Sequence, residues 1–135
     1  AALSPNTQAL CREACIAAKR HNVKVSCDLN YRKSLWSTEE AQRVMKPMME
    51  YVDVLIANEE DSEKALGIKA SDTDVTRGQL SIDGYTALAK KLTAEYGFEA
   101  VAVTLRESIS ASVNNWSALL YTDGQSFTSK KYNTL

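Results

Sequence analysis

Three short apolar runs, rich in β-branched residues, recur along the chain and are separated by longer segments with a helical pattern. The runs are residues 23–27, 52–57 and 100–105. Apolar runs of this length are typical of strands that are buried on both faces of a parallel sheet. We therefore expect three parallel strands.

The segments between these runs carry apolar residues at helical spacing and end at residues that cap helices. Ser37 and Glu40 have the spacing of a capping box, and Gly67 suits a helix C-terminus. Pro47 predicts a kink or an early end of its helix. The predicted helices are residues 4–22, 38–49, 58–67 and 81–97.

The last part of the chain has a different pattern. Residues 117–121 and 126–131 read as two strands joined by a turn at 122–125, which predicts a hairpin. Alternating strands and helices predict parallel pairing with right-handed crossovers. The expected fold is a three-layer α/β domain, with a mostly parallel sheet and an antiparallel edge hairpin. The polar residues 69–80 lack periodicity, and we expect them to form a mobile surface insertion.

Composition narrows the class of ligand. The 135 residues suit one domain, and 16 Lys and Arg residues balance 17 Asp and Glu residues without a basic stripe. Nucleic acid and acidic membrane surfaces are therefore not expected as partners, and the ligand should be a small molecule. The chain has no apolar run near the ~20 residues that span a bilayer and no signal-peptide pattern, so we expect a soluble, cytoplasmic protein.

The three cysteines do not predict a disulfide framework, because their number is odd. Cys11 and Cys15 lie one helical turn apart, but neither a neighbouring cysteine nor His21 supplies an obvious further metal ligand. We expect small, buried apolar side chains instead.

Polar side chains follow each of the three apolar runs. In open α/β sheets, ligands bind beyond the carboxyl ends of parallel strands, so these side chains should meet at one crevice. They include two arginines, whose planar forks suit a carboxylate or a phosphate. Carboxylates and an amide add oxygen ligands for a divalent cation. The residues are Asp28, Asn30 and Arg32, then Asn58, Glu59, Glu60 and Asp61, then Thr104, Arg106 and Ser108.

Each of these residues also has a simpler interpretation. Asn58 followed by Asp61 is an ordinary helix start, and the local pattern alone favours that role. The simpler interpretation of Arg32 is a loop side chain that faces water or pairs with Asp28. Thr104 suits a strand, and packing is the default role for Trp36 and Trp116.

Residues 28–36 (DLNYRKSLW), 57–61 (ANEED) and 103–108 (VTLRES), with 115–117 (NWS), resemble the ribokinase-like (PfkB) carbohydrate kinases, most closely their 2-keto-3-deoxygluconate kinase branch. The resemblance implies ATP and Mg²⁺ as cofactors. It implies that Arg32 holds a sugar-acid carboxylate, with Asp28 on the substrate side and Asn30 between substrate and nucleotide. It assigns magnesium to Asn58 and Asp61, and nucleotide phosphates to Asn58, Thr104, Arg106 and Ser108.

Two departures accompany this resemblance. The family more often has glutamate where this chain has Asp61, and residues 105–108 differ from the family's glycine-containing version. The family's Gly-Ala-Gly-Asp segment, with the catalytic aspartate, would follow Leu135, and the amino-terminal lid would precede Ala1. We therefore expect residues 1–135 to be the central part of a single domain. That part should be inactive alone and belong to a homo-oligomeric enzyme.

Other functions remain open on the sequence. They are a fructokinase- or ribokinase-type activity and a non-catalytic nucleotide-binding α/β module. A dinucleotide-dependent dehydrogenase is disfavoured, because no Gly-x-Gly-x-x-Gly follows a predicted strand.

Overall fold

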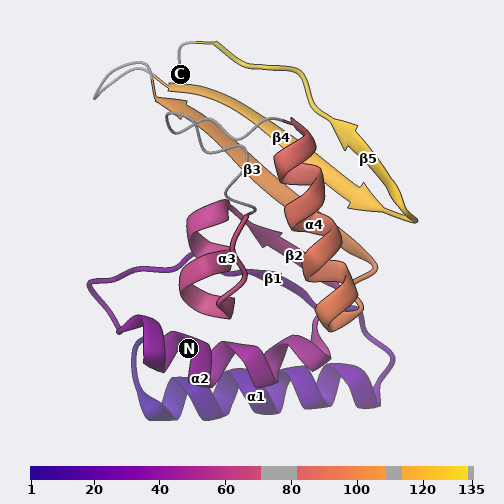
Figure 1. The fold of residues 1–135 in the computed structure, drawn as a ribbon. Helices are drawn as coiled ribbons and strands as arrows, with labels where there is room; N and C mark the ends of the chain where they lie inside the picture. Colours follow the sequence, from indigo (N-terminus) through magenta and orange to yellow (C-terminus); the bar gives the residue numbers. More distant parts are fainter. Residues whose placement is uncertain (71–81, 109–113, 134–135) are drawn as a thin grey trace.

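The computed structural model describes residues 1–70, 82–108 and 114–133, which form an α/β partial domain (Figure 1). Of the predicted surface insertion at 69–80, residues 71–80 lie outside the described residues. The elements are, in order, α1 (Pro5–Arg20), β1 (Ser26–Asp28), α2 (Thr38–Met48), the short 3₁₀ helix η1 (Met49–Tyr51), β2 (Val54–Ala57), α3 (Glu59–Leu66), α4 (Ile82–Tyr96), β3 (Ala100–Ser108), β4 (Asn114–Thr122) and β5 (Gln125–Thr128).

The strands form one mixed sheet in the order β1-β2-β3-β4-β5. β1, β2 and β3 are parallel, whereas β4 and β5 are antiparallel and add the predicted hairpin at the edge. Right-handed crossovers between parallel strands in this order place α2, α3 and α4 over one face. Figure 1 shows α3 and α4 over that face, with α1 and α2 side by side next to α3.

The helices begin and end where local chemistry predicts. The Ser37 hydroxyl accepts a hydrogen bond from the Glu40 backbone N–H at 3.2 Å, which opens α2. This helix ends at Met48, one residue after Pro47, and continues as the 3₁₀ turn η1. Gly67 ends α3 with a φ of 73°, a left-handed conformation that glycine adopts without a Cβ penalty. No helix in the described part of the chain is long and apolar enough to cross a membrane.

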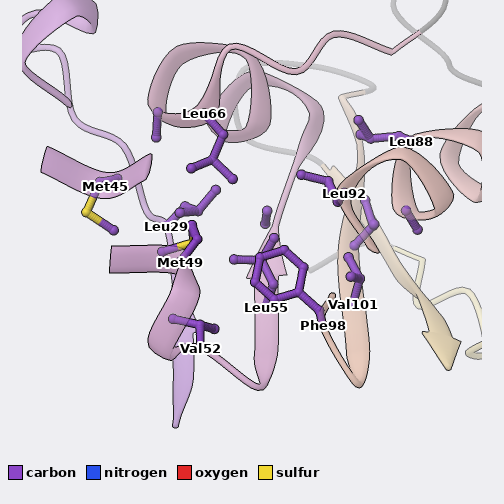
Figure 2. Close-up of a cluster of buried hydrophobic side chains, with 14 of the residues drawn as sticks. Leu29, Met45, Met49, Val52, Leu55, Leu66, Leu88, Leu92, Phe98 and Val101 are labelled. Atoms are coloured by element: carbon purple, nitrogen blue, oxygen red, sulfur yellow. The ribbon is translucent and has the colours of Figure 1, made fainter. Parts of the chain in front are cut away.

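The core lies between the helices and one face of the sheet (Figure 2). Alternate residues of the central strands point into it, so every second position is fully buried. Helices α3 and α4 contribute leucines from their inner sides. The residues with 0–1% exposure include Met49, Leu55, Leu66, Leu88, Leu92, Val101, Val103 and Leu119.

The expectation that the apolar runs are buried on both faces was wrong for β2. Leu55 and Ala57 are buried, whereas Val54 and Ile56 on the opposite face are only half-buried. The reason is that the helices described here cover only one face of these strands.

Several strand boundaries also differ from the prediction. The first strand begins at Ser26 rather than at residue 23, because Val23 is 55% exposed and precedes the ladder. β3 extends to Ser108 and β4 begins at Asn114, so both strands are longer than predicted, and together they form a hairpin that the sequence did not predict. The predicted turn between β4 and β5 is present, with Asp123 and Gly124 both at positive φ, as a tight hairpin turn requires.

Candidate functional site

A cleft of about 380 Å³ opens at the carboxyl ends of β1, β2 and β3. The expectation that the three strand ends share one crevice is therefore met by the geometry. Every predicted site residue except Ser108 lines it; the Ser108 backbone ends β3, but its side chain is outside the described part. The lining residues are Asp28, Asn30, Arg32, Asn58, Glu59, Glu60, Asp61, Thr104, Arg106 and Trp116.

The first wall of the cleft is the segment 28–36, which we call the arginine loop. Its start continues the sheet, because the Leu29 N–H donates to the Ile56 carbonyl at 3.0 Å. The Asp28 carboxylate then accepts from the Asn30 N–H at 3.2 Å. Asn30 has a φ of 40°, and asparagine is one of the few residue types that tolerate this region. The chain thereby turns sharply out of β1 toward the cleft.

Two buried aromatic residues hold the arginine loop. Tyr31 is 9% exposed and Trp36 is 8% exposed, and the Tyr31 hydroxyl donates to the Trp36 carbonyl at 3.2 Å. A turn between them closes with the Leu35 N–H donating to the Arg32 carbonyl at 2.9 Å. Arg32 therefore extends from a fixed turn rather than from a freely moving segment.

The Arg32 side chain is exposed at the cleft. Its Nη1 approaches the Tyr31 carbonyl at 3.4 Å. No ion pair joins Arg32 to Asp28 in the described structure, so the simpler interpretation of the two as a surface pair is wrong. The guanidinium is placed to meet an anion that enters the cleft.

The second wall is the start of α3. The Asn58 side-chain oxygen accepts from the Asp61 N–H at 2.7 Å, so Asn58 is the helix N-cap that the local pattern favours. The Ser62 hydroxyl also donates to the Asn58 carbonyl, at 2.8 Å. Because Asn58 lines the cleft as well, the cap holds its amide at the ligand side of the helix start.

Asp61 is a buried carboxylate with 7% exposure. Its Oδ1 accepts a hydrogen bond from the Tyr31 backbone N–H at 3.0 Å, which joins the arginine loop to α3. Burial raises the pKa of this carboxyl group, and the negative charges of Asp28 and Glu60 raise it further, while hydrogen bonds from the Tyr31 and Asn58 backbones oppose the shift. The sequence did not predict the hydrogen bond between Tyr31 and Asp61.

The third wall comes from β3 and β4. Thr104 and Arg106 project from the same face of β3, and Trp116 is the cross-strand partner of Arg106. The Arg106 Nε donates to the Asn114 side-chain oxygen at 2.9 Å, and its guanidinium carbon lies 5.7 Å from the centroid of the Trp116 ring. This geometry is a cation–π contact.

Trp116 is the site residue that the sequence interpretation missed. Packing was the expected role for both tryptophans, and it holds for Trp36, but Trp116 is 39% exposed and lines the cleft. The pairing register of the hairpin formed by β3 and β4 would have indicated its position. Once β3 and β4 are paired through Ser108 and Asn114, Trp116 must stand opposite Arg106.

The donor set of the cleft suits Mg²⁺ together with phosphates. Among the described residues, no group of three His, Cys, Asp or Glu side chains has metal-binding geometry. Magnesium usually keeps several waters and needs only one or two carboxylates besides substrate phosphates. The Asn58 Oδ1 and Asp61 Oδ1 already accept backbone hydrogen bonds. The Asp28 Oδ1 also accepts one, from the Asn30 N–H, so the exposed carboxylate of Glu60 is the freer oxygen ligand beside them.

Solved structures of similar proteins share this fold. A 2-dehydro-3-deoxygluconokinase from Thermotoga maritima is 48% identical over 93% of the chain, with a TM-score of 0.82. A PfkB family carbohydrate kinase from Listeria grayi is 28% identical over 98% of the chain, with a TM-score of 0.80. The chain covers 36% and 38% of these two proteins.

Comparison of sequences gives the same result. The chain is 32% identical over 107 residues, 78% of its length, to a 2-dehydro-3-deoxygalactonokinase from Haloferax volcanii, and it covers 29% of that protein. It thus spans about a third of the length of its relatives. The profile of the pfkB family carbohydrate kinases matches residues 2–108, which include two walls of the cleft and most of the third. With this match over most of its length, the chain belongs to the pfkB family of carbohydrate kinases.

Proposed function

We propose that the complete protein is an ATP-dependent kinase that transfers the γ-phosphoryl group to 2-keto-3-deoxygluconate, also called 2-dehydro-3-deoxygluconate. The observation that carries this proposal is Arg32, an exposed guanidinium held on a fixed turn at a cleft that a second guanidinium, Arg106, also lines. Two anion-binding groups suit a substrate with a carboxylate and a cosubstrate with phosphates. The name of the Thermotoga maritima relative supports the choice of sugar acid.

In this proposal each wall has its own task. Arg32 binds the sugar-acid carboxylate through its planar fork, with Asp28 beside it, and Asn30 lies between the sugar and the nucleotide phosphates. Arg106 and Thr104 face the nucleotide phosphates, and the family resemblance assigns the same role to Ser108, whose side chain is outside the described part. Asn58 and Asp61, at the start of α3, lie on the metal side.

Phosphoryl transfer depends mainly on positioning and on stabilisation of charge, with a base that accepts the hydroxyl proton. Mg²⁺, when bound, would neutralise charge on the phosphates, and the oxygen ligands of the cleft suit it. We propose that none of the site residues of this chain is that base, since the chain contains no Gly-Ala-Gly-Asp segment. We therefore propose that residues 1–135 alone do not turn over.

The test is a kinase assay of the full-length protein with ATP and Mg²⁺. It compares 2-keto-3-deoxygluconate with neutral sugars, fructose and ribose. We expect kcat/KM for the sugar acid to exceed that for either neutral sugar by about 10- to 100-fold, the scale of a lost charge-assisted contact. Preference for fructose or ribose would replace the sugar-acid assignment with a fructokinase- or ribokinase-type activity. ATP binding without turnover of any sugar would indicate a non-catalytic module.

A second sugar acid, 2-dehydro-3-deoxygalactonate, is supported by the Haloferax volcanii relative. A carboxylate contact at Arg32 does not by itself distinguish the two acids, since both carry the carboxylate. The same assay with both compounds decides between them. We also propose that the complete protein is a homo-oligomer in the cytoplasm. Sedimentation tests the assembly, and cell fractionation tests the location.

A further inference from the structure

We propose that Asp61 is a positioning residue, which holds the arginine loop against the start of α3 and thereby sets the place of Arg32 in the cleft. The contact that points to this role is the hydrogen bond from the Tyr31 N–H to the Asp61 Oδ1, at 3.0 Å. The inference rests on the proposed function only where it takes Arg32 as the group that receives the sugar acid.

The contact joins two elements that are distant in the sequence. Tyr31 and Asp61 are 30 positions apart, and both are buried, with exposures of 9% and 7%. A backbone N–H that is buried needs an acceptor, and a carboxylate is a strong one. Loss of the Asp61 oxygen would leave the Tyr31 N–H without this partner and release the loop from α3.

The acceptor is itself held in place. The Asp61 backbone N–H donates to the Asn58 side chain at 2.7 Å, and Asn58 directly follows the last residue of β2. The position of the carboxylate is therefore fixed by the sheet through the helix N-cap. Tyr31 is thus connected to β2 through Asp61 and Asn58. Each step of this connection is either a hydrogen bond or a bond of the backbone.

Arg32 follows Tyr31 directly, so the fixed peptide sets where the arginine side chain begins. On the other side, the Tyr31 ring is buried and its hydroxyl is bonded to the Trp36 carbonyl at 3.2 Å. The Arg32 Nη1 also approaches the Tyr31 carbonyl at 3.4 Å. A displacement of Tyr31 would therefore displace the guanidinium from its place in the cleft.

This role differs from the magnesium role that the family resemblance assigns to the same position. A metal-organising carboxylate needs its charge, whereas a hydrogen-bond acceptor for Tyr31 needs an oxygen at the right place. Asp61→Asn keeps an oxygen and removes the charge. Asp61→Ala removes both. The two variants therefore separate the two roles.

The experiment uses the full-length protein and its Asp61→Asn and Asp61→Ala variants, with Glu63→Ala as a control at a half-exposed position of α3 outside the cleft lining. Amide hydrogen exchange is measured for residues 29–36 without ligands. Binding of 2-keto-3-deoxygluconate is measured by calorimetry without ATP and Mg²⁺, and binding of ATP with Mg²⁺ is measured without the sugar. Melting temperatures record general loss of stability.

We expect Asp61→Ala to speed exchange in the arginine loop at least tenfold and to weaken sugar-acid binding at least tenfold. Asp61→Asn should keep wild-type exchange and sugar-acid binding, as should Glu63→Ala. A loss of Mg·ATP affinity in both Asp61 variants reports the separate metal role of the charge. Exchange and sugar-acid binding that stay unchanged in Asp61→Ala would overturn the proposal.

Two further outcomes are also decisive. If Asp61→Ala does not fold, Asp61→Asn decides alone, because slow exchange and wild-type sugar binding support the positioning role and their loss refutes it. If the wild type does not bind the sugar acid, the proposed substrate is wrong. In that case the exchange rates of residues 29–36 still show whether Asp61 holds the loop.

Discussion

The Arg106 guanidinium stands 5.7 Å from the centroid of the Trp116 ring, on the strand directly opposite. Asn114 accepts from the Arg106 Nε on the same strand as Trp116. The arginine is thus held by two residues of β4 while it lines the cleft. An arginine with a fixed orientation loses less conformational entropy when it binds an anion, so this pair should contribute to nucleotide affinity.

The first prediction concerns the aromatic ring of Trp116. Trp116→Leu removes the cation–π contact, which at an exposed site is worth about 0.5–1 kcal/mol. We expect the Kd for ATP of the full-length protein to rise about 2- to 5-fold, as that energy implies. Equilibrium titration with ATP in the presence of Mg²⁺ measures the change.

The matched control is Trp116→Phe, which keeps an aromatic face for Arg106. It should lie between the wild type and Trp116→Leu. Equal ATP affinity in all three proteins would show that the ring does not hold Arg106 for the nucleotide.

The residues that the sequence placed correctly are those whose environment is set by nearby positions. Asn58, Gly67 and the turn at Asp123 depend on contacts within a few residues, and each has the predicted conformation. The shared cleft was placed correctly for a similar reason, since parallel strands present their carboxyl ends on one edge of the sheet.

The features that the sequence missed depend on contacts between distant segments. The bond between Tyr31 and Asp61 joins residues 30 positions apart. Trp116 faces Arg106 only in the register of the long hairpin. Likewise, Ile56 is half-buried because burial of that face depends on what covers the sheet, which the composition of β2 does not reveal.

The second prediction concerns the fork of Arg32. Arg32→Lys keeps the positive charge but cannot form two parallel hydrogen bonds to a carboxylate. We expect KM for the sugar acid to rise about 10- to 100-fold, in line with the ~1.5–3 kcal/mol of a hydrogen bond to a charged group. Steady-state assays of the full-length enzyme measure it, and KM for ATP, which should change little, is the internal control. A similar rise in both KM values would contradict a carboxylate role for Arg32.

The third prediction separates the two roles of Asn58. Asn58→Ser keeps a side-chain oxygen for the Asp61 N–H but removes the amide, whereas Asn58→Ala removes the cap as well. Asn58→Ala should lower the free energy of unfolding by ~1 kcal/mol, and Asn58→Ser should leave it nearly unchanged. Urea denaturation measures both.

The control for this comparison is Ser37→Ala, which removes the N-cap of α2 away from the cleft lining. It should cost similar stability and leave kcat unchanged. If Asn58→Ser also keeps the full kcat, Asn58 is a helix cap only, and its assigned role at the phosphates is wrong.

The fourth prediction concerns the buried core. Leu88 on α4 has 0% exposure, whereas Leu120 on β4 is 40% exposed on the opposite side of the sheet from the core. Leu88→Ala should destabilise the protein by ~2–5 kcal/mol, the range for large-to-small changes in a packed core. Leu120→Ala should cost less than about 1 kcal/mol, since surface changes are usually small. Equal losses in urea denaturation would show that the face with Leu120 is covered in the complete protein.

The last prediction concerns stability at alkaline pH. Burial raises the pKa of the Cys27 thiol from 9.0 to about 11, and the nearby Cys15, Asp28 and Cys11 add to the rise. Between pH 9 and pH 11 the unfolded chain loses this proton while the folded chain keeps it, so the free energy of unfolding should fall as the pH rises. Below pH 9 the protonated Cys27 thiol contributes its full share, roughly 2–3 kcal/mol, to the free energy of unfolding. Above pH 11 this contribution is lost. Cys15 and Tyr96, whose pKa values burial also raises, add to the decline, so the measurement is the difference between the wild type and Cys27→Ser. Urea denaturation from pH 8 to pH 11 should give a flatter curve for Cys27→Ser. Parallel curves would show that Cys27 titrates alike in the folded and unfolded chains.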